Sequence, residues 1–277
     1  MNRVWLAALA CLCAVGCTPK PSSHPAVQSS AFPGRIVSIA PSVTEMLYAV
    51  GAGGKVIAID DYSNFPAVVE GLPRVGGMAL NYEKIVALKP DLVIGVADLQ
   101  GASLNRLDKL GIRTLRLDTT TYAKTTSAIR LIASATGCAD GGVRAATHME
   151  DALRVAQRPG KKRYRRVLVI VEASPKLFIA GRYTFFDGLL DVAGVSNAAE
   201  KPGFQMASLE GLIALKADLV ITTTAADNST VSSLLSRAHL KTPVITAPRD
   251  SFVRPGPRLA DGLTWLSKAV RAPVKAR

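Results

Sequence analysis

The chain has 277 residues, of which 48% are hydrophobic and 20% are charged, so it can bury a sizeable core and is not expected to be disordered. Its 34 lysines and arginines outnumber its 21 acidic residues, which gives a formal net charge of +13. That charge would fit nucleic-acid binding, but only residues 161–166 (KKRYRR) form a basic run. We interpret this run as a solvated helix end before a strand and expect no nucleic-acid partner.

Residues 1–17 predict an export signal. A positively charged start precedes an apolar run at 4–15 that is too short to span a bilayer. The sequence AVGC, which ends at Cys17, resembles a bacterial lipobox, whose cysteine is lipidated and becomes the mature N-terminus; a plain secretory leader is the alternative. Both interpretations place the folded part in the periplasm or at the cell surface, and lipidation would anchor it to a membrane. Residues 18–33, rich in Pro and Ser, are expected to form a flexible tether.

The first half of the folded part alternates apolar strands with helices. A Ser-x-x-Glu sequence at 42–45 predicts a capping box at the start of the first helix. Strands are expected at residues 35–40, 55–60, 91–96 and 113–117, and helices at 46–50, 83–88 and 102–110. Strands that are apolar on both faces and alternate with helices indicate a mainly parallel sheet flanked by helices.

The loops after these strands are the expected ligand side, because ligands of parallel sheets bind beyond the carboxyl ends of the strands. The loop at 60–66 contains two aromatic residues, Tyr62 and Phe65, which favours a role beyond core packing; packing within the loop is the alternative for both. A Gly-rich turn at 74–79, which includes Gly77 and Met78, would let the backbone approach a ligand closely.

The second half of the chain repeats part of the first. Residues 83–95 (EKIVALKPDLVIG) and 210–222 (EGLIALKADLVIT) match at eight positions and begin 127 residues apart, a spacing that fits a duplicated α/β lobe. The other expected elements are helices at 122–137, 142–156, 185–192 and 262–270, and strands at 166–171 and 244–247. The predicted fold is therefore α/β, with a lobe at 34–137, one long connecting helix at 138–163 and a second lobe at 164–277.

The loops expected in the second half carry aromatic and charged residues, like those of the first. They lie at 172–182, 200–207 and 248–258, and they contain Phe178, Phe204, Asp250, Phe252 and Arg254. Aromatic and charged groups in the loops of both halves predict a ligand cleft between two lobes.

Few residues support metal or catalytic chemistry. Three of the four cysteines lie in the leader, so Cys138 can join neither a disulfide framework nor a cysteine-rich metal site. His148 and His239 lack zinc spacing, and the sequence contains no nucleophile elbow and no phosphate loop. We expect no enzyme, no cofactor and no metal, while an extracytoplasmic enzyme and a divalent-metal receptor stay open as alternatives.

Four stretches together resemble the bacterial ABC-transporter substrate-binding proteins of the helical-backbone type, and most closely their cobalamin-binding subgroup. They are residues 39–45 (IAPSVTE), 61–66 (DYSNFP), 75–95 and 252–258 (FVRPGPR). The resemblance implies two α/β lobes joined by one long helix, a ligand held between them, and docking on a permease dimer in the inner membrane through one surface glutamate per lobe. Glu83 and Glu210 match those glutamates by position; a helix-start carboxylate favoured by the macrodipole is the alternative.

The same resemblance places five of the loop residues in or near the cleft, namely Tyr62, Phe178, Phe204, Asp250 and Arg254. Gly77, Met78 and Phe252 complete the predicted ligand-binding set. The ligand implied is cobalamin or a related corrinoid, bound by a monomer. Haem and a ferric siderophore are alternatives, since relatives of this fold bind them. In addition, tryptophan is common in the ligand site of cobalamin binders, but it occurs here only as Trp5 in the leader and Trp265 on the closing helix.

Overall fold

A computed structural model describes residues 32–272 of the chain. The predicted export signal, the lipidation site at Cys17 and nearly all of the predicted tether lie outside the described residues. Within residues 32–272, no helix is both long and apolar enough to cross a membrane.

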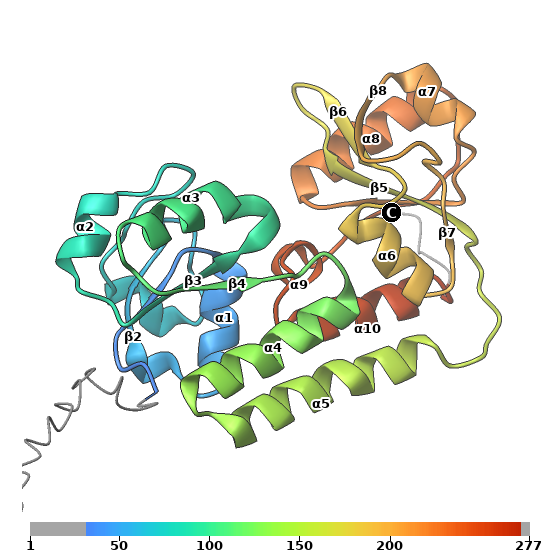
Figure 1. Ribbon diagram of the computed structural model, residues 1–277. Coiled ribbons are helices and arrows are strands. Elements are labelled where there is room, and N and C mark those ends of the chain that lie inside the picture. Colours follow the sequence, from blue (N-terminus) through green and yellow to red (C-terminus); the bar gives the residue numbers. More distant parts are fainter. Residues whose placement is uncertain (1–31, 273–277) are drawn as a thin grey trace, which may run out of the picture. The chain divides into compact units, whose positions relative to one another are not determined.

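The first lobe is built on a four-stranded parallel sheet in the order β2-β1-β3-β4 (Figure 1). Its strands are β1 (Ile36–Ser38), β2 (Val56–Ile59), β3 (Leu92–Val96) and β4 (Thr114–Leu117), and its helices are α1 (Pro41–Ala49), α2 (Tyr82–Ala87) and α3 (Ala97–Lys109). All four strands were predicted from sequence, and every residue of β3 is buried. A parallel sheet covered on both faces requires such continuous apolar strands.

The start of α1 differs from its prediction. The helix begins at Pro41, with Ala40 as the N-cap and no side-chain capping bond, so the capping box predicted at 42–45 is wrong. Proline at the first helical position starts a helix without a cap, since its fixed φ suits the helix and its missing N–H would be unbonded there anyway. Glu45 is therefore free for another role and is buried.

The second lobe is built on a mixed sheet in the order β10-β9-β5-β6-β8, with β7 also paired to β5. Its strands are β5 (Arg166–Glu172), β6 (Leu177–Ala180), β7 (Ser196–Asn197), β8 (Phe204–Ala207), β9 (Leu219–Thr222) and β10 (Val244–Thr246), and its helices are α6 (Phe185–Val192), α7 (Leu209–Ala214), α8 (Ala225–Arg237) and α9 (Arg249–Val253). Strands β10, β9 and β7 run parallel to the strands they pair with, whereas β6 and β8 are antiparallel. The loops predicted at 172–182 and 200–207 are thus corrected, because each contains a strand.

Two long helices lead the chain from the first sheet to the second. Helix α4 (Tyr122–Thr136) ends at Gly137, and α5 (Ala139–Ala156) packs beside it (Figure 1). A Cβ atom on Gly142 would lie 2.2 Å from the Cβ of Ala133, so this close approach of the two helices requires glycine. The last helix, α10 (Leu259–Ala269), packs along α5.

Helix α5 ends at Ala156, and residues 157–165 are irregular. The basic run at 161–166 therefore lies in this irregular segment and in the first residue of β5. Its interpretation as a solvated helix end is wrong. The described residues have their largest apolar core under both sheets and against α4, α5 and α10, so one continuous core links the two lobes.

The sequence repeat has a structural cause. The Oδ2 atom of Asp91 accepts the backbone N–H groups of Gly34 and Arg35, both at 2.9 Å. The Oδ2 atom of Asp218, 127 positions later, accepts those of Arg165 and Arg166 at 3.0 and 2.9 Å. In both lobes this aspartate ties the end of the repeated helix to the start of the central strand.

The basic residues of the repeat are also accounted for. The Nη2 atom of Arg35 donates to the carbonyl of Leu88, and that of Arg166 donates to the carbonyl of Leu215. Lys89 and Lys216 both adopt a left-handed backbone conformation, with φ of 45° and 47°. Most of the repeated pattern is thus a structural unit that closes each helix onto its sheet.

Candidate functional site

A buried polar network shapes the loop after β2. Asp60 is fully buried, and its carboxylate accepts the backbone N–H of Tyr62 at 2.9 Å and the hydroxyl proton of Ser63. The Thr44 and Ser63 hydroxyls are 2.8 Å apart, and Thr44 donates to Ser38 at 2.8 Å. The network fixes the loop from beneath and leaves the ring of Tyr62 exposed.

Tyr62 lies against the Gly-rich turn at residues 74–79. A Cβ atom on Gly77 would lie within 2.8 to 2.9 Å of three atoms of the Tyr62 ring and hydroxyl, so only glycine allows this contact. The next residue, Met78, has 91% of its surface exposed. Tyr62, Gly77 and Met78 therefore form one exposed, partly apolar surface on the first lobe.

The predicted aromatic residues of the second lobe differ in exposure. Phe204, on β8, is exposed, and Phe178, on β6, is half-buried. Phe252 is 0% exposed, with its ring 5.6 Å from that of Phe186 and 5.7 Å from that of Trp265. A fully buried ring cannot contact a ligand, so we remove Phe252 from the ligand-binding set and assign it to the core.

Tyr183 is an exposed aromatic residue that sequence reasoning missed. It precedes α6 and has φ of 62°, a left-handed conformation that costs a non-glycine residue about 1–2 kcal/mol. The carboxylate of Asp187 accepts its backbone N–H at 2.9 Å and holds that conformation. No local sequence pattern marks such a residue, and strain of this kind is concentrated at functional sites.

Asp250 and Arg254 belong to an ion cluster around Glu45, whose side chain is only 2% exposed. Arg258 donates to both oxygens of Glu45, at 2.9 and 2.6 Å, and Arg254 donates to one of them at 3.2 Å. Asp250 lies 3.6 Å from each guanidinium. Because two carboxylates face two guanidiniums, the charges of the cluster are balanced. The hydrogen bonds and negative charge of Glu45 raise the pKa of Arg258 further above its usual value.

The same cluster joins the two lobes. Glu45 lies on α1 of the first lobe, whereas Arg254 and Arg258 flank the turn between α9 and α10. Arg254 also donates to the side-chain carbonyl of Asn64 at 2.7 Å, and the Arg258 guanidinium lies 4.1 Å from the centre of the Phe65 ring. The loop that carries Tyr62 is thereby held to the second half of the chain. Sequence reasoning missed Glu45, Asn64 and Arg258 as members of this cluster.

The two repeated glutamates lie in the first turns of α2 and α7. Asn81 caps α2 by accepting the backbone N–H of Lys84, and Ser208 caps α7 by accepting that of Gly211. Glu83 and Glu210 are exposed, and neither forms an ion pair with another of residues 32–272. Hydrogen bonds from its own backbone N–H and from Ser208 lower the pKa of Glu210, so its carboxylate is charged at neutral pH.

Metal ligands do not cluster in the part of the chain that the structure describes. Within it, no group of three or more His, Cys, Asp or Glu side chains could hold a metal ion. His148 lies 3.7 Å from Asp261, at the surface of α5, and Cys138 is a half-buried free thiol.

We expect stability to depend on the ionisation of Asp60. Burial raises its pKa above the ordinary 3.8, so the folded protein binds this proton more tightly than the unfolded chain, and stability falls as pH rises through the raised pKa. Asp60→Asn removes this dependence. In urea unfolding, the stability of the variant should rise relative to that of the unmodified protein as the pH rises above about 4.

Asp118→Asn is the control for this prediction. Hydrogen bonds from Lys124 and Thr120 lower the pKa of Asp118 to about 2, so its contribution to stability is constant above about pH 5. A stability difference between Asp60→Asn and the unmodified protein that stays constant over this pH range would contradict a raised pKa.

The chain forms two α/β lobes, one with a parallel sheet and one with a mixed sheet, and helices join them. This arrangement defines a two-lobed binding-protein fold. The family model described as "Periplasmic binding protein" matches residues 36–242. The chain belongs to this family, and the family resemblance seen in the sequence is confirmed.

The relatives of the chain include a substrate-binding lipoprotein and vitamin B12-binding proteins. An uncharacterized ABC transporter substrate-binding lipoprotein of Bacillus subtilis is 29% identical over 253 residues, which cover 86% of this chain and 80% of the relative. A vitamin B12-binding protein of Pectobacterium atrosepticum is 28% identical over 239 residues, which cover 83% and 85%.

Two solved structures share the fold. The periplasmic vitamin B12-binding protein of Vibrio cholerae has a TM-score of 0.77 and 22% identity, with 86% of this chain and 97% of that chain covered. A periplasmic haem-binding protein of Pseudomonas aeruginosa has a TM-score of 0.71 and 26% identity, with 88% and 96% covered. The predicted two-lobed fold class is confirmed.

Proposed function

We propose that the protein is the extracytoplasmic substrate-binding component of an ABC importer, and that it captures cobalamin or a related corrinoid between its lobes and delivers it to a permease dimer in the inner membrane. The family, and relatives named as a substrate-binding lipoprotein and as vitamin B12-binding proteins, support the proposal. In this proposal the protein acts as a monomer without catalysis, and lipidated Cys17 anchors it to a membrane.

The proposed ligand surface combines exposed rings with few free charges. It consists of Tyr62, Gly77, Met78, Phe178, Phe204, Asp250 and Arg254, together with Tyr183. The side chains around a corrin ring are neutral amides, whereas haem carries two carboxylates and many ferric siderophores are anionic. An anionic ligand would need unpaired cations, but Glu45 and Asp250 already neutralise Arg254 and Arg258. This balance is the observation that favours a corrinoid.

Haem is the second candidate, and one observation supports it. Tyrosine is among the side chains that bind haem iron, and the Tyr62 phenol is exposed on the proposed ligand surface. A ferric siderophore would fill the same role, but nothing at this surface favours it.

The absorption spectrum of the protein, purified from cells supplied with both corrinoid and haem, tests the proposal. A bound corrinoid and a bound haem have different visible spectra, so the spectrum identifies the ligand directly. Calorimetry with cyanocobalamin, haemin and ferric siderophores then gives the affinity of each. We expect a corrinoid spectrum and binding of cyanocobalamin; binding of none of the three would contradict the proposed function.

Substitutions of Tyr62 separate the two ligands further. Tyr62→Ala removes the ring and is expected to weaken cyanocobalamin binding about tenfold or more, the usual effect of losing an aromatic contact at a binding site. Tyr62→Phe keeps the ring and should bind cyanocobalamin with little change, because the proposed contact is apolar. If the unmodified protein binds haemin and Tyr62→Phe does not, the phenol is an iron ligand and the haem alternative is correct.

A further inference from the structure

The basic run at 161–166, which the candidate site does not use, borders a surface pocket of the second lobe. This basic pocket has a volume of about 850 Å³. One side comes from residues 160–165, in the irregular segment before β5, and the other from residues 194–196, at the start of β7. Its lining includes three cations and no acidic residue, and these pocket cations are Lys161, Lys162 and Arg165.

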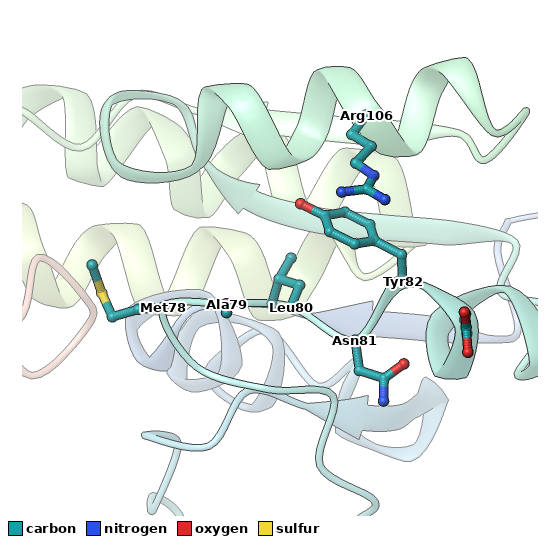
Figure 2. A pocket seen from close by; sticks show the side chains of 7 residues that line it. Met78, Ala79, Leu80, Asn81, Tyr82 and Arg106 are labelled. Carbon is teal, nitrogen blue, oxygen red and sulfur yellow. The ribbon is translucent and has the colours of Figure 1, made fainter.

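A pocket of the first lobe, beside Glu83, shows how unusual this charge is (Figure 2). It has a volume of about 490 Å³, and its lining includes one carboxylate, of Glu83, and one guanidinium, of Arg106. The guanidinium lies 4.1 Å from the centre of the Tyr82 ring, so it is already stacked on an aromatic partner. In that pocket the charges are balanced, whereas the basic pocket is purely cationic.

The pocket cations have no partner among residues 32–272. Their side chains form no ion pair and no hydrogen bond within this part of the chain. Two carboxylates of adjacent segments have other partners. Asp218 accepts the backbone N–H groups of Arg165 and Arg166, and Glu200 pairs with the Arg166 guanidinium at 3.3 Å. The pocket cations are therefore available to an anion from outside the chain.

Lys162 is built into the pocket. Its side chain is half-buried, and its amine lies directly over Gly194. Gly194 has φ of 69°, and a Cβ atom at this position would overlap the amine, so glycine leaves the space that the cation occupies. A half-buried ammonium loses part of its hydration, and a bound anion would offset that cost.

Backbone hydrogen bonds fix the irregular segment that carries the cations. The N–H groups of Arg163 and Tyr164 donate to the carbonyl of Val270, at the end of α10, at 3.0 and 3.1 Å. The N–H of Ser196 donates to the carbonyl of Arg165 at 2.7 Å, which joins the two sides of the pocket. The pocket is thus held in place before any ligand binds, which lowers the entropic cost of binding.

The basic pocket and the candidate ligand surface lie at opposite ends of β5. Ser196 pairs with Arg166, the first residue of β5, whereas Phe178 pairs with Glu172, the last. The 7 residues of this strand span about 20 Å. A ligand in the basic pocket would therefore leave the candidate ligand surface free.

Positive charge continues along the same edge of the sheet. Lys216 and Lys241 are exposed and precede β9 and β10, which run parallel to β5 in the order β10-β9-β5. The amino ends of these strands thus form a basic edge with the pocket at its centre, and such an edge attracts anions.

We propose that the basic pocket binds a phosphate group carried by a larger molecule. Guanidinium and ammonium groups are well suited to phosphate oxygens, and a volume of about 850 Å³ has room for more than the phosphate alone. The headgroup of an anionic phospholipid and a soluble phosphate ester share this chemistry. The proposal does not depend on which ligand binds at the candidate ligand surface, and it can fail without affecting the proposed function.

Two binding measurements distinguish the sources of the phosphate. Flotation with phosphatidylcholine vesicles, with and without phosphatidylglycerol, tests the lipid headgroup, and calorimetry with glycerol 3-phosphate tests the soluble ester. Both use residues 18–277, which contain the whole core and omit the predicted leader and lipidation site, so that neither can bind the vesicles. We expect binding in at least one measurement, and the one that is positive identifies the source. Binding in neither would overturn the proposal.

The triple variant Lys161→Ser, Lys162→Ser and Arg165→Ser tests the pocket itself, and we expect it to bind about tenfold more weakly or less. The control Lys84→Ser, Lys176→Ser and Arg249→Ser removes the same charge from exposed side chains that lie outside the basic pocket, and it should bind like the unmodified protein. Equal losses in both triple variants would overturn the proposal, because general surface charge would then explain the binding.

Ser196→Asp gives an independent test that keeps all three cations. It places a carboxylate among them, on a residue that is exposed and lines the pocket, and it should also weaken binding. Cyanocobalamin affinity, measured in parallel, should be the same in all these variants if they fold, because the pocket is at the far end of β5. Unchanged phosphate binding by Ser196→Asp would overturn the proposal.

Discussion

Replacing both Glu83 and Glu210 with alanine is expected to abolish ligand uptake while leaving ligand affinity unchanged. Both carboxylates are exposed, neither forms an ion pair within residues 32–272, and the caps of their helices come from Asn81 and Ser208 instead. The helices therefore lose the macrodipole interaction of each carboxylate and, at Glu210, its exposed hydrogen bonds with its own N–H and with Ser208, while both caps stay in place. The variant should fold normally, so a loss of uptake would report on docking.

Uptake of labelled cyanocobalamin, by cells or by vesicles that contain the permease, measures this effect. Each single variant removes one of two charge contacts and should give an intermediate rate. The control Glu150→Ala with Glu200→Ala removes the same charge from exposed ion pairs with Arg130 and Arg166, whose contribution to stability is small. Transport at the normal rate by the Glu83 and Glu210 double variant would contradict the docking role.

The central parallel strands of both sheets could be predicted because burial on both faces makes them continuously apolar. Every residue of β3 and β9 is buried. Strands β6 and β8 have only four residues each and are partly exposed, so their sequences resemble loops. Helix α8 was not predicted because its sequence is largely polar and only Val231 and Leu235 are buried apolar residues on it.

The candidate site was predictable only where its residues are close in sequence. Tyr62, Gly77 and Met78 lie in two loops of the first lobe, and the paired glutamates are marked by the repeat itself. The cluster around Glu45 joins residues up to 213 positions apart, and no local pattern links them. Glu45 was assigned to a capping box because its spacing from Ser42 fits one equally well. Only the fold shows that its carboxylate pairs with two arginines.

Glu45→Gln is expected to lower the free energy of unfolding by about 3 kcal/mol, because it leaves the largely buried guanidiniums of Arg254 and Arg258 with only the partly exposed Asp250 as a charged partner. The matched control is Glu150→Gln, which breaks an exposed ion pair with Arg130 and should cost less than about 1 kcal/mol. Urea unfolding of both variants measures the difference. Equal losses would show that the cluster contributes no more than a surface pair.

A triple variant separates the cost of unpaired charge from the loss of packing. This variant combines Glu45→Gln with Arg254→Met and Arg258→Met. It removes the uncompensated guanidiniums, and the new methionine side chains can still pack against Phe65. Replacing buried ion pairs with apolar side chains of similar size is often neutral or stabilising, so the triple variant should recover most of the stability that Glu45→Gln loses. Its affinity for cyanocobalamin should nevertheless fall, because the Asn64 hydrogen bond then no longer holds the Tyr62 loop, and the Glu45 hydrogen bond no longer holds α1, to the second half of the chain. Recovery of stability without any loss of affinity would show that the cluster has no part in positioning the ligand surface.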